Sequence, residues 1–373
     1  MGGRLSISIL ESPRDHAKTQ SKESMEANLK HLMKMAVSGL AVLISLAATP
    51  VSTHAQLSKV RTVWVILMEN HNWTGNNAGA AFGAPDLKGN PSAPYINGQL
   101  LQTSAHAEQY FNPPNNHPSQ PNYLWLEAGT NFGVLDDTQP GQPQLTTDQH
   151  LVKLLENAGI SWMAYAEPDF GSPVFDVCPL DFTFLDVEHL AFPYFNDIND
   201  GLNPQSKDCI AHIRPYYQLA TDLADHTVAR YNFITPNLCH DGHEGISPCA
   251  QTEPTDNTQR SDAWLKQNVP LILESKEYKE GGALFIIWDE AEDSGQFSDG
   301  PIGMFILSPF AKGGGKRPFE NFVHYDHSST LKTLQEIFHV GPLLGAAADP
   351  NTKNLSDFFR GGEDQGGDDD SGN

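Results

Sequence analysis

The sequence predicts an α/β fold: a mostly parallel central sheet with helices on both faces and a disulfide-stapled insertion. Three runs rich in β-branched and apolar residues have the composition of strands buried on both sides; they are residues 60–68, 231–235 and 283–288. Between the first two runs, apolar residues recur at helical spacing: Leu151, Leu154, Leu155 and Ala158. Strands that alternate with helices are typical of a parallel sheet.

Shorter patterns complete the predicted order of elements. They are a helix at 95–101, a strand within 105–111, a helix at 119–128, a strand at 160–165, helices at 216–226 and 262–275, a strand at 302–307 and a helix at 328–338. Thr146 and Gln149 have the spacing of a capping box, so the helix through Leu151 is expected to begin there. Pro270 is expected to kink or split the helix that contains it.

The segment 167–208 interrupts this alternation, since it is rich in proline and aromatic residues. A long insertion of this kind commonly forms one wall of a substrate pocket. Phe192, Tyr194 and Phe195 are candidates for that wall; the alternative is that they pack a small core of the insertion itself.

Four cysteines allow three disulfide pairings. The sequential pairing, Cys178 with Cys209 and Cys239 with Cys249, is the most economical. The spacing of the second pair is not that of a zinc finger, which favours disulfides over a thiolate metal site. Free buried thiols remain the alternative.

The chain divides into three expected parts. Residues 1–55 are an N-terminal extension and signal peptide, because a basic stretch precedes the apolar run 35–48 and small residues precede Gln56. That run is short for a membrane span, so no stable span is expected in the mature protein, although a signal anchor is the alternative. Residues 56–345 form the main folded domain, and 346–373 an acidic, disordered tail. Export and cysteine pairs together indicate a secreted or periplasmic protein.

The formal net charge of −23 argues against a nucleic-acid partner. A protein that binds the phosphate backbone needs clustered lysine and arginine, and this chain has 23 such residues against 46 acidic ones.

Ser119 stands where a helix is expected to begin. His117 and Pro118 disfavour helix before it, and Pro121 suits a first turn, where a missing N–H costs nothing. A helix N-terminus offers unpaired amides and partial positive charge, which bind phosphate groups. The simpler alternative is that Ser119 only caps the helix.

Acidic, amide or histidine pairs follow three of the predicted strands: Glu69-Asn70, His240-Asp241 after a short loop, and Asp289-Glu290. Because parallel strands end at the same edge of a sheet, these side chains are expected to converge there. Clustered carboxylates repel each other unless a cation neutralises them, so a divalent metal such as Zn, Mn, Ca or Mg is expected. The alternative is that each pair is solvated separately.

A metal beside Ser119 would lower the pKa of its hydroxyl group and make it a nucleophile. His243 or His327 would then protonate the leaving group or hold a phosphate oxygen. An esterase triad built on Ser119 is a weaker alternative, because the pattern G-x-S-x-G is absent around it.

Five motifs in order carry a family resemblance: VWVILMENHNW, HPSQPNYLWLEAG, ITPNLCHDGHE, FIIWDE and YDHSSTLKTLQEIF. Between about Val60 and Phe338 the chain resembles the secreted phosphoesterases that include bacterial and fungal acid phosphatases and non-specific phospholipases C, in the alkaline-phosphatase superfamily. The resemblance implies an alkaline-phosphatase-like fold and the following roles. The metal ligands are Glu69, Asn70, Ser119, Asp289 and Glu290, and Ser119 is the nucleophile that forms phosphoserine. His243 and His327 are further catalytic residues. The substrate-binding residues are His117, Asn122 and Asp241, of which the first two orient either the nucleophile or the phosphate.

The resemblance therefore implies a secreted, metal-dependent phosphoesterase that acts on a small phosphomonoester. A phospholipase C that cleaves phospholipid diesters is the alternative, although the chain lacks the extra C-terminal domains of long phospholipase members. From another class, the alternative is a binding protein that keeps the fold without catalysis. Loss of Ser119 or of an acidic pair would indicate that, and all are present.

Overall fold

An eight-stranded sheet, ordered β5-β4-β6-β1-β7-β8-β2-β9, forms the centre of this computed structural model. The structure describes residues 57–74, 87–142, 144–168, 176–182, 185–243, 249, 253–291 and 300–361. The sheet strands are β1 (Thr62–Met68), β2 (Ala105–Ala107), β4 (Trp162–Ala166), β5 (Ile213–Pro215), β6 (Tyr231–Thr235), β7 (Gly282–Trp288), β8 (Met304–Leu307) and β9 (Phe319–Asn321). Within this sheet β8 runs antiparallel to both of its neighbours, and the other pairings are parallel. The predicted mostly parallel sheet is confirmed.

The three central strands are the three apolar runs predicted from the sequence. β1 pairs in parallel with β6 on one side and β7 on the other, and Val65 lies opposite both Phe233 and Phe285. Every residue of these three strands is buried. Burial of each large apolar side chain contributes about 1.5–3 kcal/mol, so this strand triplet anchors the core.

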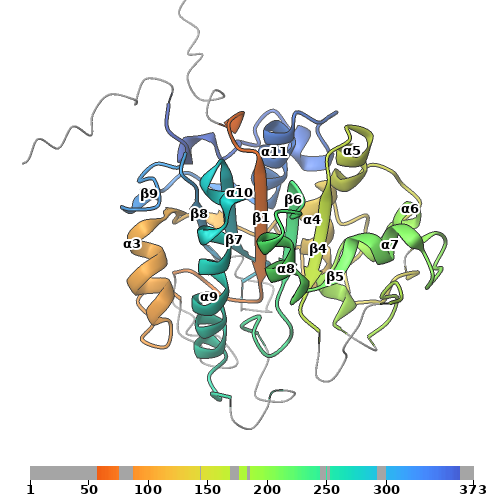
Figure 1. Ribbon diagram of the computed structural model, residues 1–373, viewed down its shortest axis with the longest axis horizontal. Coiled ribbons are helices and arrows are strands. Elements are labelled where there is room, and N and C mark those ends of the chain that lie inside the picture. Colours follow the sequence, from red (N-terminus) through yellow and green to blue (C-terminus); the bar gives the residue numbers. More distant parts are fainter. Residues whose placement is uncertain are drawn as a thin grey trace, which may run out of the picture. The chain divides into compact units, whose positions relative to one another are not determined.

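Helices cover both faces of the sheet, as predicted. Figure 1 shows α8 (Gln218–Ala224), α9 (Asn257–Glu274) and α10 (Lys276–Lys279) in front of the strands, with α4 (Ser119–Ala128) and α11 (His327–Phe338) behind them. Smaller elements connect these layers: η1 (Ile96–Leu100), α3 (Leu101–Thr103), α5 (Leu151–Asn157), η2 (Val187–His189), η3 (Phe192–Tyr194), α6 (Asn196–Asn199) and α7 (Lys207–His212). A two-stranded sheet of β3 (Tyr110–Phe111) and β10 (Tyr325–Asp326) precedes α11. In the described part of the chain, no helix combines the length and the apolar character that a membrane span requires.

Several predicted boundaries were wrong. The helix expected from Thr146 begins at Leu151, because Leu145 forms a parallel bridge with Phe195 that keeps the preceding chain extended. The capping box is therefore absent, and the amide of Gln149 donates to Thr147 Oγ1 instead. Pro270 does not split α9, which runs continuously from Asn257 to Glu274. The strand expected within 105–111 is two short strands, β2 and β3.

The insertion at 167–208 is joined to the domain by its disulfide and by its aromatic residues. Cys178 pairs with Cys209, and Cys239 with Cys249, which confirms the sequential pairing. Phe192 stacks on Trp162 with ring centroids 5.1 Å apart and meets Phe233 of β6 edge-on. Together with Tyr194 and Phe195 it is completely buried. These aromatics therefore extend the core beside the sheet, and the expectation that they line a substrate pocket was wrong.

The folded domain extends past the expected boundary at residue 345. The chain forms η4 (Gly345–Ala348) and η5 (Ser356–Phe358), and Leu355, Phe358 and Phe359 are buried. Apolar burial of this kind means that 346–361 belongs to the domain rather than to a tail. The rest of the expected tail and the signal peptide lie outside the described residues.

Candidate active site

The predicted convergence of acidic side chains occurs where β1 and β7 end. Met68 lies opposite Trp288 in the last register pair, so Glu69 and Asp289 leave the sheet side by side. The amide of Asp289 donates to Met68 O at 2.9 Å, and the amide of Glu69 donates to Asp241 O at 3.0 Å. The side chains of Glu69, Asp241 and Asp289 are all fully buried.

Asn70 connects this cluster to His243. Its backbone amide donates to Asp289 Oδ1 at 2.9 Å. The Asn70 side-chain amide has one orientation in which both its nitrogen and its oxygen find partners. In that orientation the nitrogen donates to Glu69 Oε2 at 3.2 Å, and the oxygen accepts from His243 Nε2 at 3.2 Å. Asn70 has a φ of 20°, outside the regions that most residues adopt. A backbone held in this way marks candidate functional positions.

The buried carboxyl groups favour a bound cation. Burial, followed by the charges of Asp289 and Asp241, raises the pKa of Glu69 well above its ordinary value. Burial also raises the pKa of Asp289. The carboxylate, amide and hydroxyl oxygens gathered here are hard donors, which suit a divalent ion. Glu69, Asn70, Asp289 and Ser119 therefore fit the expected metal-ligand set by their chemistry.

Ser119 is the first residue of α4, in agreement with the sequence prediction. Its Oγ donates to Glu69 Oε2 at 2.8 Å. Tyr123, one turn further along α4, donates its hydroxyl to Glu69 Oε1. The helix ends at Gly129, whose φ of 69° suits glycine and whose Cβ, if present, would lie 2.7 Å from Leu344 O.

The first turn of α4 is less open to a ligand than the sequence indicated. The amide of Gln120 donates to Asp137 Oδ1 at 3.0 Å, and Pro121 has no N–H. The side chain of Gln120 in turn accepts the amide of Thr138 at 2.8 Å. The loop at 137–138 thus fixes the start of the helix and leaves fewer amides for a phosphate group.

Glu290 contacts the residues around the serine rather than extending toward Glu69. Its Oε2 lies 2.5 Å from His117 Nδ1 and accepts from Asn122 Nδ2 at 3.1 Å. Asn122 is also bonded to Asn116. Burial raises the pKa of Glu290 to about 8, although His117 opposes this shift. The structure therefore brings His117, Asn122 and Glu290 together as a polar group beside the serine.

His327 is buried at the start of α11 and contacts protein groups through both ring nitrogens. Its Nε2 donates to the carbonyl oxygen of Asp289 at 2.6 Å, because a carbonyl can only accept. Its Nδ1 lies 3.0 Å from the hydroxyl of Tyr110, which donates to it. Burial lowers the pKa of His327 to about 4, so the ring is neutral near pH 7. This arrangement holds the Asp289 backbone in place.

His243 is half-buried and differs from His327 in this respect. Its backbone amide donates to Asp241 Oδ1 at 2.9 Å, and its Nε2 faces Asn70. Asp241 and His243 therefore lie beside the carboxylate cluster, as their spacing and the resemblance implied. His240, the other residue of the predicted pair, instead has Nδ1 2.9 Å from Glu167 Oε2.

Several residues at the site were missed by sequence reasoning. Tyr123 had a usable signal, since positions four apart share a face of a helix. No sequence signal pointed to His189, because it comes from the insertion. Its ring stacks on that of Tyr123 with centroids 5.4 Å apart, and its Nε2 lies 3.6 Å from Glu69 Oε2. Burial lowers the pKa of His189 to about 3. Asp137 and Tyr110 are likewise brought in by distant segments.

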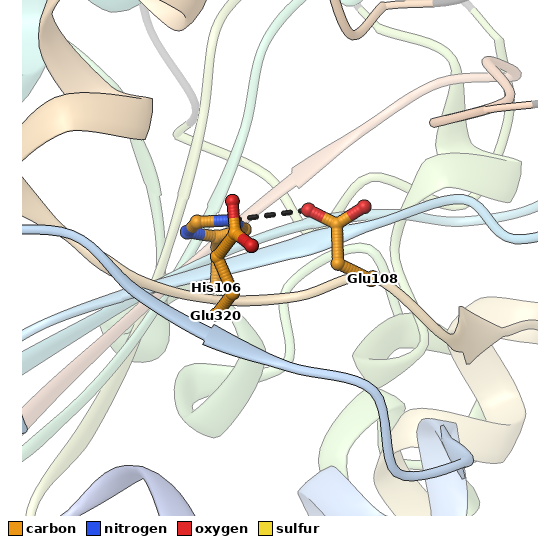
Figure 2. A group of neighbouring side chains, drawn as sticks. All are labelled: His106, Glu108 and Glu320. Carbon is orange, nitrogen blue, oxygen red and sulfur yellow. Dashed lines mark ion pairs between the residues drawn. The ribbon is translucent and has the colours of Figure 1, made fainter.

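A cluster of three side chains with metal-ligand spacing lies away from this site. Figure 2 shows His106 and Glu108 joined by an ion pair, with Glu320 of the adjoining strand beside them. Lys88 Nζ lies 2.6 Å from Glu108 Oε1, and Trp73 Nε1 donates to Glu108 Oε2 at 3.0 Å. Although burial acts in the opposite direction, these bonds lower the pKa of Glu108 to about 2. Lys88 already neutralises the carboxylate, so we read this cluster as an ion-pair network. Another group of possible ligands, Glu156, Asp208 and His212, also lies outside the site.

Two relatives identify the kind of protein that this chain resembles. It is 28% identical over 237 residues to a probable acid phosphatase of Kluyveromyces lactis, an alignment that covers 60% of this chain and 50% of the relative. It is 27% identical over 278 residues to a phosphatidylinositol-3-phosphatase of Mycobacterium tuberculosis, with 73% and 77% covered. The chain thus spans half the length of the Kluyveromyces relative.

A solved protein of the alkaline phosphatase superfamily from Vibrio parahaemolyticus aligns with 78% of this chain and 70% of its own, at 11% identity and a TM-score of 0.47. The match to a family is more direct. Residues 90–341, more than half of the 373 residues, match the family described as the Phosphoesterase family. The chain therefore belongs to the Phosphoesterase family.

Proposed function

We propose that this protein hydrolyses phosphoric monoesters and that Ser119 is its nucleophile. The observation that carries the proposal is the hydrogen bond from Ser119 Oγ to Glu69 Oε2, at 2.8 Å, at the first residue of a helix and above a buried carboxylate cluster. The names of the two phosphatase relatives support a monoester substrate.

The proposed reaction has two displacements at phosphorus. Ser119 Oγ attacks the phosphorus atom, its proton passes to Glu69 Oε2, and the bond to the leaving alcohol breaks. The alcohol takes a proton from His243, which is the half-buried histidine beside the cluster. Water then attacks the phosphoserine and gives a proton to His243, Oγ takes its proton back from Glu69 as the bond to phosphorus breaks, and inorganic phosphate leaves.

Other residues of the site hold these groups in place. Tyr123 orients Glu69, and His327 fixes the backbone of Asp289 through its carbonyl oxygen. His117, which lies beside Glu290, is proposed to bind a phosphate oxygen next to Ser119. The fully buried Asn122 donates to Glu290 and to Asn116 O, so it holds Glu290 in place. We therefore propose positioning roles for His327 and Asn122 and a substrate contact for His117.

A divalent cation completes the proposal. Glu69, Asn70, Asp289 and Ser119 would hold it, and Glu290 remains a further candidate. When bound, such an ion offsets the buried negative charge and lowers the pKa of the serine hydroxyl.

We also propose that the protein is exported. Disulfides form and persist in oxidising compartments, and the chain has two of them. Detection of the mature protein in the medium or periplasm, with an N-terminus near Gln56, tests this point; a protein retained in the cytosol with its N-terminal segment intact would contradict it.

The nucleophile is tested with Ser119→Ala and p-nitrophenyl phosphate. The substitution is expected to lower kcat by roughly 10³-fold or more while the fold persists. Ser308→Ala is a matched control, because this buried serine bonds Gly282 O at 2.8 Å, away from the site. Mass spectrometry of acid-quenched protein should show one phosphoryl group on Ser119. Retained turnover in Ser119→Ala would contradict the proposal.

A further inference from the structure

A cleft of about 420 Å³ lies between α8 and α9. On α9 it is lined by Arg260, Trp264 and Leu271, whose spacings of four and seven residues place them on one face of the helix. The opposite wall includes Tyr216 and Tyr217, at the entry to α8. Figure 1 shows both helices in front of the sheet and α4 behind it. The cleft and the helix that carries the proposed nucleophile therefore lie on opposite faces of the sheet.

The walls of the cleft are aromatic and apolar. Tyr216 and Trp264 face each other with ring centroids 5.2 Å apart and ring planes inclined at 44°. At the rim, Tyr217 is 55% exposed and Leu271 is 44% exposed. Large apolar side chains that remain exposed around a hollow are typical of a ligand-binding surface. These walls suit a ligand with a flat or apolar body.

Two carboxyl groups, those of Glu167 and Glu253, also line the cleft. Glu167 has His240 Nδ1 2.9 Å from its Oε2, so a protonated His240 ring offsets its charge. Burial, followed by the charge of Glu167, raises the pKa of Tyr216, which places this carboxylate within electrostatic reach of an aromatic wall. The Glu253 carboxyl group makes no hydrogen bond or ion pair with any residue that the structure describes. Glu253 therefore offers a negative charge to a ligand.

The positive charge of Arg260 is compensated within the protein. The residue is buried, and its Nε and Nη1 donate to two main-chain carbonyl oxygens at 2.8 and 2.7 Å. Burial lowers the pKa of Arg260, and the charges of Asp241, Asp256 and Glu253 oppose that shift. Two of these three acids, Asp241 and Asp256, lie outside the lining of the cleft. A cation in the cleft therefore meets carboxylates without facing an uncompensated guanidinium group.

Aromatic faces and carboxylates together form a favourable environment for an organic cation. An ammonium group is attracted to the faces of tryptophan and tyrosine rings, and the attraction grows when the group is desolvated. The formal net charge of −23 also raises the local concentration of cations around the protein.

We propose that the cleft between α8 and α9 binds an organic cation, in which an ammonium group is carried on an aromatic or apolar body. Glu253 supplies the opposite charge, and Tyr217 covers the bound cation at the rim. This binding site is separate from the candidate active site and does not depend on the proposed hydrolysis of phosphate esters.

The first test compares two ligands that have the same shape and differ in charge. Benzylamine is protonated at pH 7, whereas benzyl alcohol is neutral. Calorimetric titration of the full chain is expected to show the ammonium form binding at least about tenfold more tightly than the alcohol. Equal affinity for the two ligands, or no binding of the ammonium form, would overturn the inference.

The second test locates the bound cation. Glu253→Gln and Tyr217→Ala are each expected to weaken the binding of benzylammonium by about tenfold. Glu274→Gln removes an exposed acid of α9 outside the lining, and Phe322→Ala removes a ring that is 68% exposed elsewhere. Both control variants should bind as the parent does. Unchanged binding in Glu253→Gln and Tyr217→Ala would reject the cleft as the site.

A third variant separates this cleft from the buried carboxylate cluster near Ser119, which is another candidate for a cation. Asp289→Asn removes one acid of that cluster and should leave the affinity for benzylammonium within about twofold of the parent value. A tenfold loss in Asp289→Asn with none in Glu253→Gln would place the cation at the candidate active site and overturn the inference.

Discussion

Ser119 and Tyr123 lie one helical turn apart on α4, and their hydroxyl groups donate to opposite oxygens of the Glu69 carboxylate. One helix therefore fixes both oxygens of a buried acid that follows a strand of the central sheet. This geometry couples the position of the proposed nucleophile to that of the proposed metal ligand. Rigid support of this kind is what catalytic groups require.

Removal of the Tyr123 hydroxyl group tests this coupling. In Tyr123→Phe, Glu69 loses one of two hydroxyl donors, so the affinity for a divalent ion and kcat/KM should each fall about 10- to 100-fold. Calorimetric titration with Mn²⁺ and assays with p-nitrophenyl phosphate measure the two effects. Tyr165→Phe is the matched control, since Tyr165 donates to Asp222 at 2.7 Å elsewhere in the domain. Equal losses in both variants would contradict a specific role for Tyr123.

Chelation tests the metal independently of catalysis. Without a cation, the buried Glu69 and Asp289 carboxyl groups remain close together, and burial raises the pKa of each. A divalent ion at 100 times its Kd should stabilise the fold by about 2.7 kcal/mol, and EDTA should remove that gain. Thermal unfolding with Zn²⁺, Mn²⁺, Ca²⁺ and Mg²⁺ in turn identifies the ion. A melting temperature that none of these ions changes would contradict the site.

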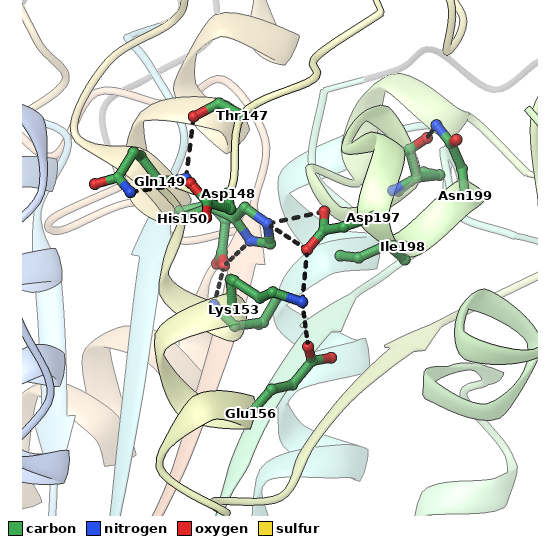
Figure 3. A network of polar contacts seen from close by, with 12 residues as sticks. Thr147, Asp148, Gln149, His150, Lys153, Glu156, Asp197, Ile198 and Asn199 are labelled. Carbon is green, nitrogen blue, oxygen red and sulfur yellow. Dashed lines mark hydrogen bonds and ion pairs between the residues drawn. The ribbon is translucent and has the colours of Figure 1, made fainter. Parts of the chain in front are cut away.

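A buried histidine outside the candidate active site gives the domain a separate response to pH. Figure 3 shows His150 beside Asp197, with Lys153 bridging Asp197 and Glu156. On the other side of the ring, His150 Nδ1 lies 3.7 Å from Glu127 Oε1. Burial alone would lower the pKa of His150, but its bonds with Asp197 and Glu127 outweigh burial and raise the pKa to about 9. The fully buried ring is therefore protonated in the folded protein near pH 7.

This raised pKa predicts a loss of stability at alkaline pH. The folded state holds the His150 proton more tightly than the unfolded chain does. The contribution of this proton to the free energy of unfolding is therefore fully present below pH 6.5 and is lost as pH rises through about 9. The loss amounts to about 3 kcal/mol, and His150→Gln should remove it. Urea unfolding across this pH window measures the difference between variant and parent. His226→Gln, which changes an exposed ion pair, is the control. The prediction is contradicted if the free energy of unfolding falls equally steeply with pH in the parent and in His150→Gln.

The parts of the fold that follow from local pattern were predictable. Strands β1, β6 and β7 match apolar runs, and the residues after β1 and β7 converge because parallel neighbours end at one edge. Ser119 was found through its helix start, which depends only on nearby prolines. These features are short-range or follow from sheet geometry, so one sequence suffices to infer them.

The features that sequence reasoning missed depend on contacts between distant segments. The start of α5 is set by the bridge from Leu145 to Phe195, about fifty residues away in sequence, which overrides a plausible capping box. His189 reaches Glu69 from the insertion, and Lys88 turns the His106 cluster into an ion-pair network. The periodicity of the sequence does not predict such contacts, because they form only when the domain folds.

Asp137 offers a final test of how the serine is held. Its Oδ1 accepts the amide of Gln120 at 3.0 Å, next to Ser119, and thereby fixes the first turn of α4. Asp137→Ala removes this acceptor, which should cost about 0.5–2 kcal/mol of stability and lower kcat about tenfold with little change in KM. Asp137→Asn retains an oxygen acceptor and should recover most of kcat, whereas the exposed Asp136→Ala should match the parent. Steady-state kinetics with p-nitrophenyl phosphate compares the three variants. A similar loss in Asp137→Asn and Asp137→Ala would show that the charge of Asp137, rather than its hydrogen bond to the helix, supports Ser119.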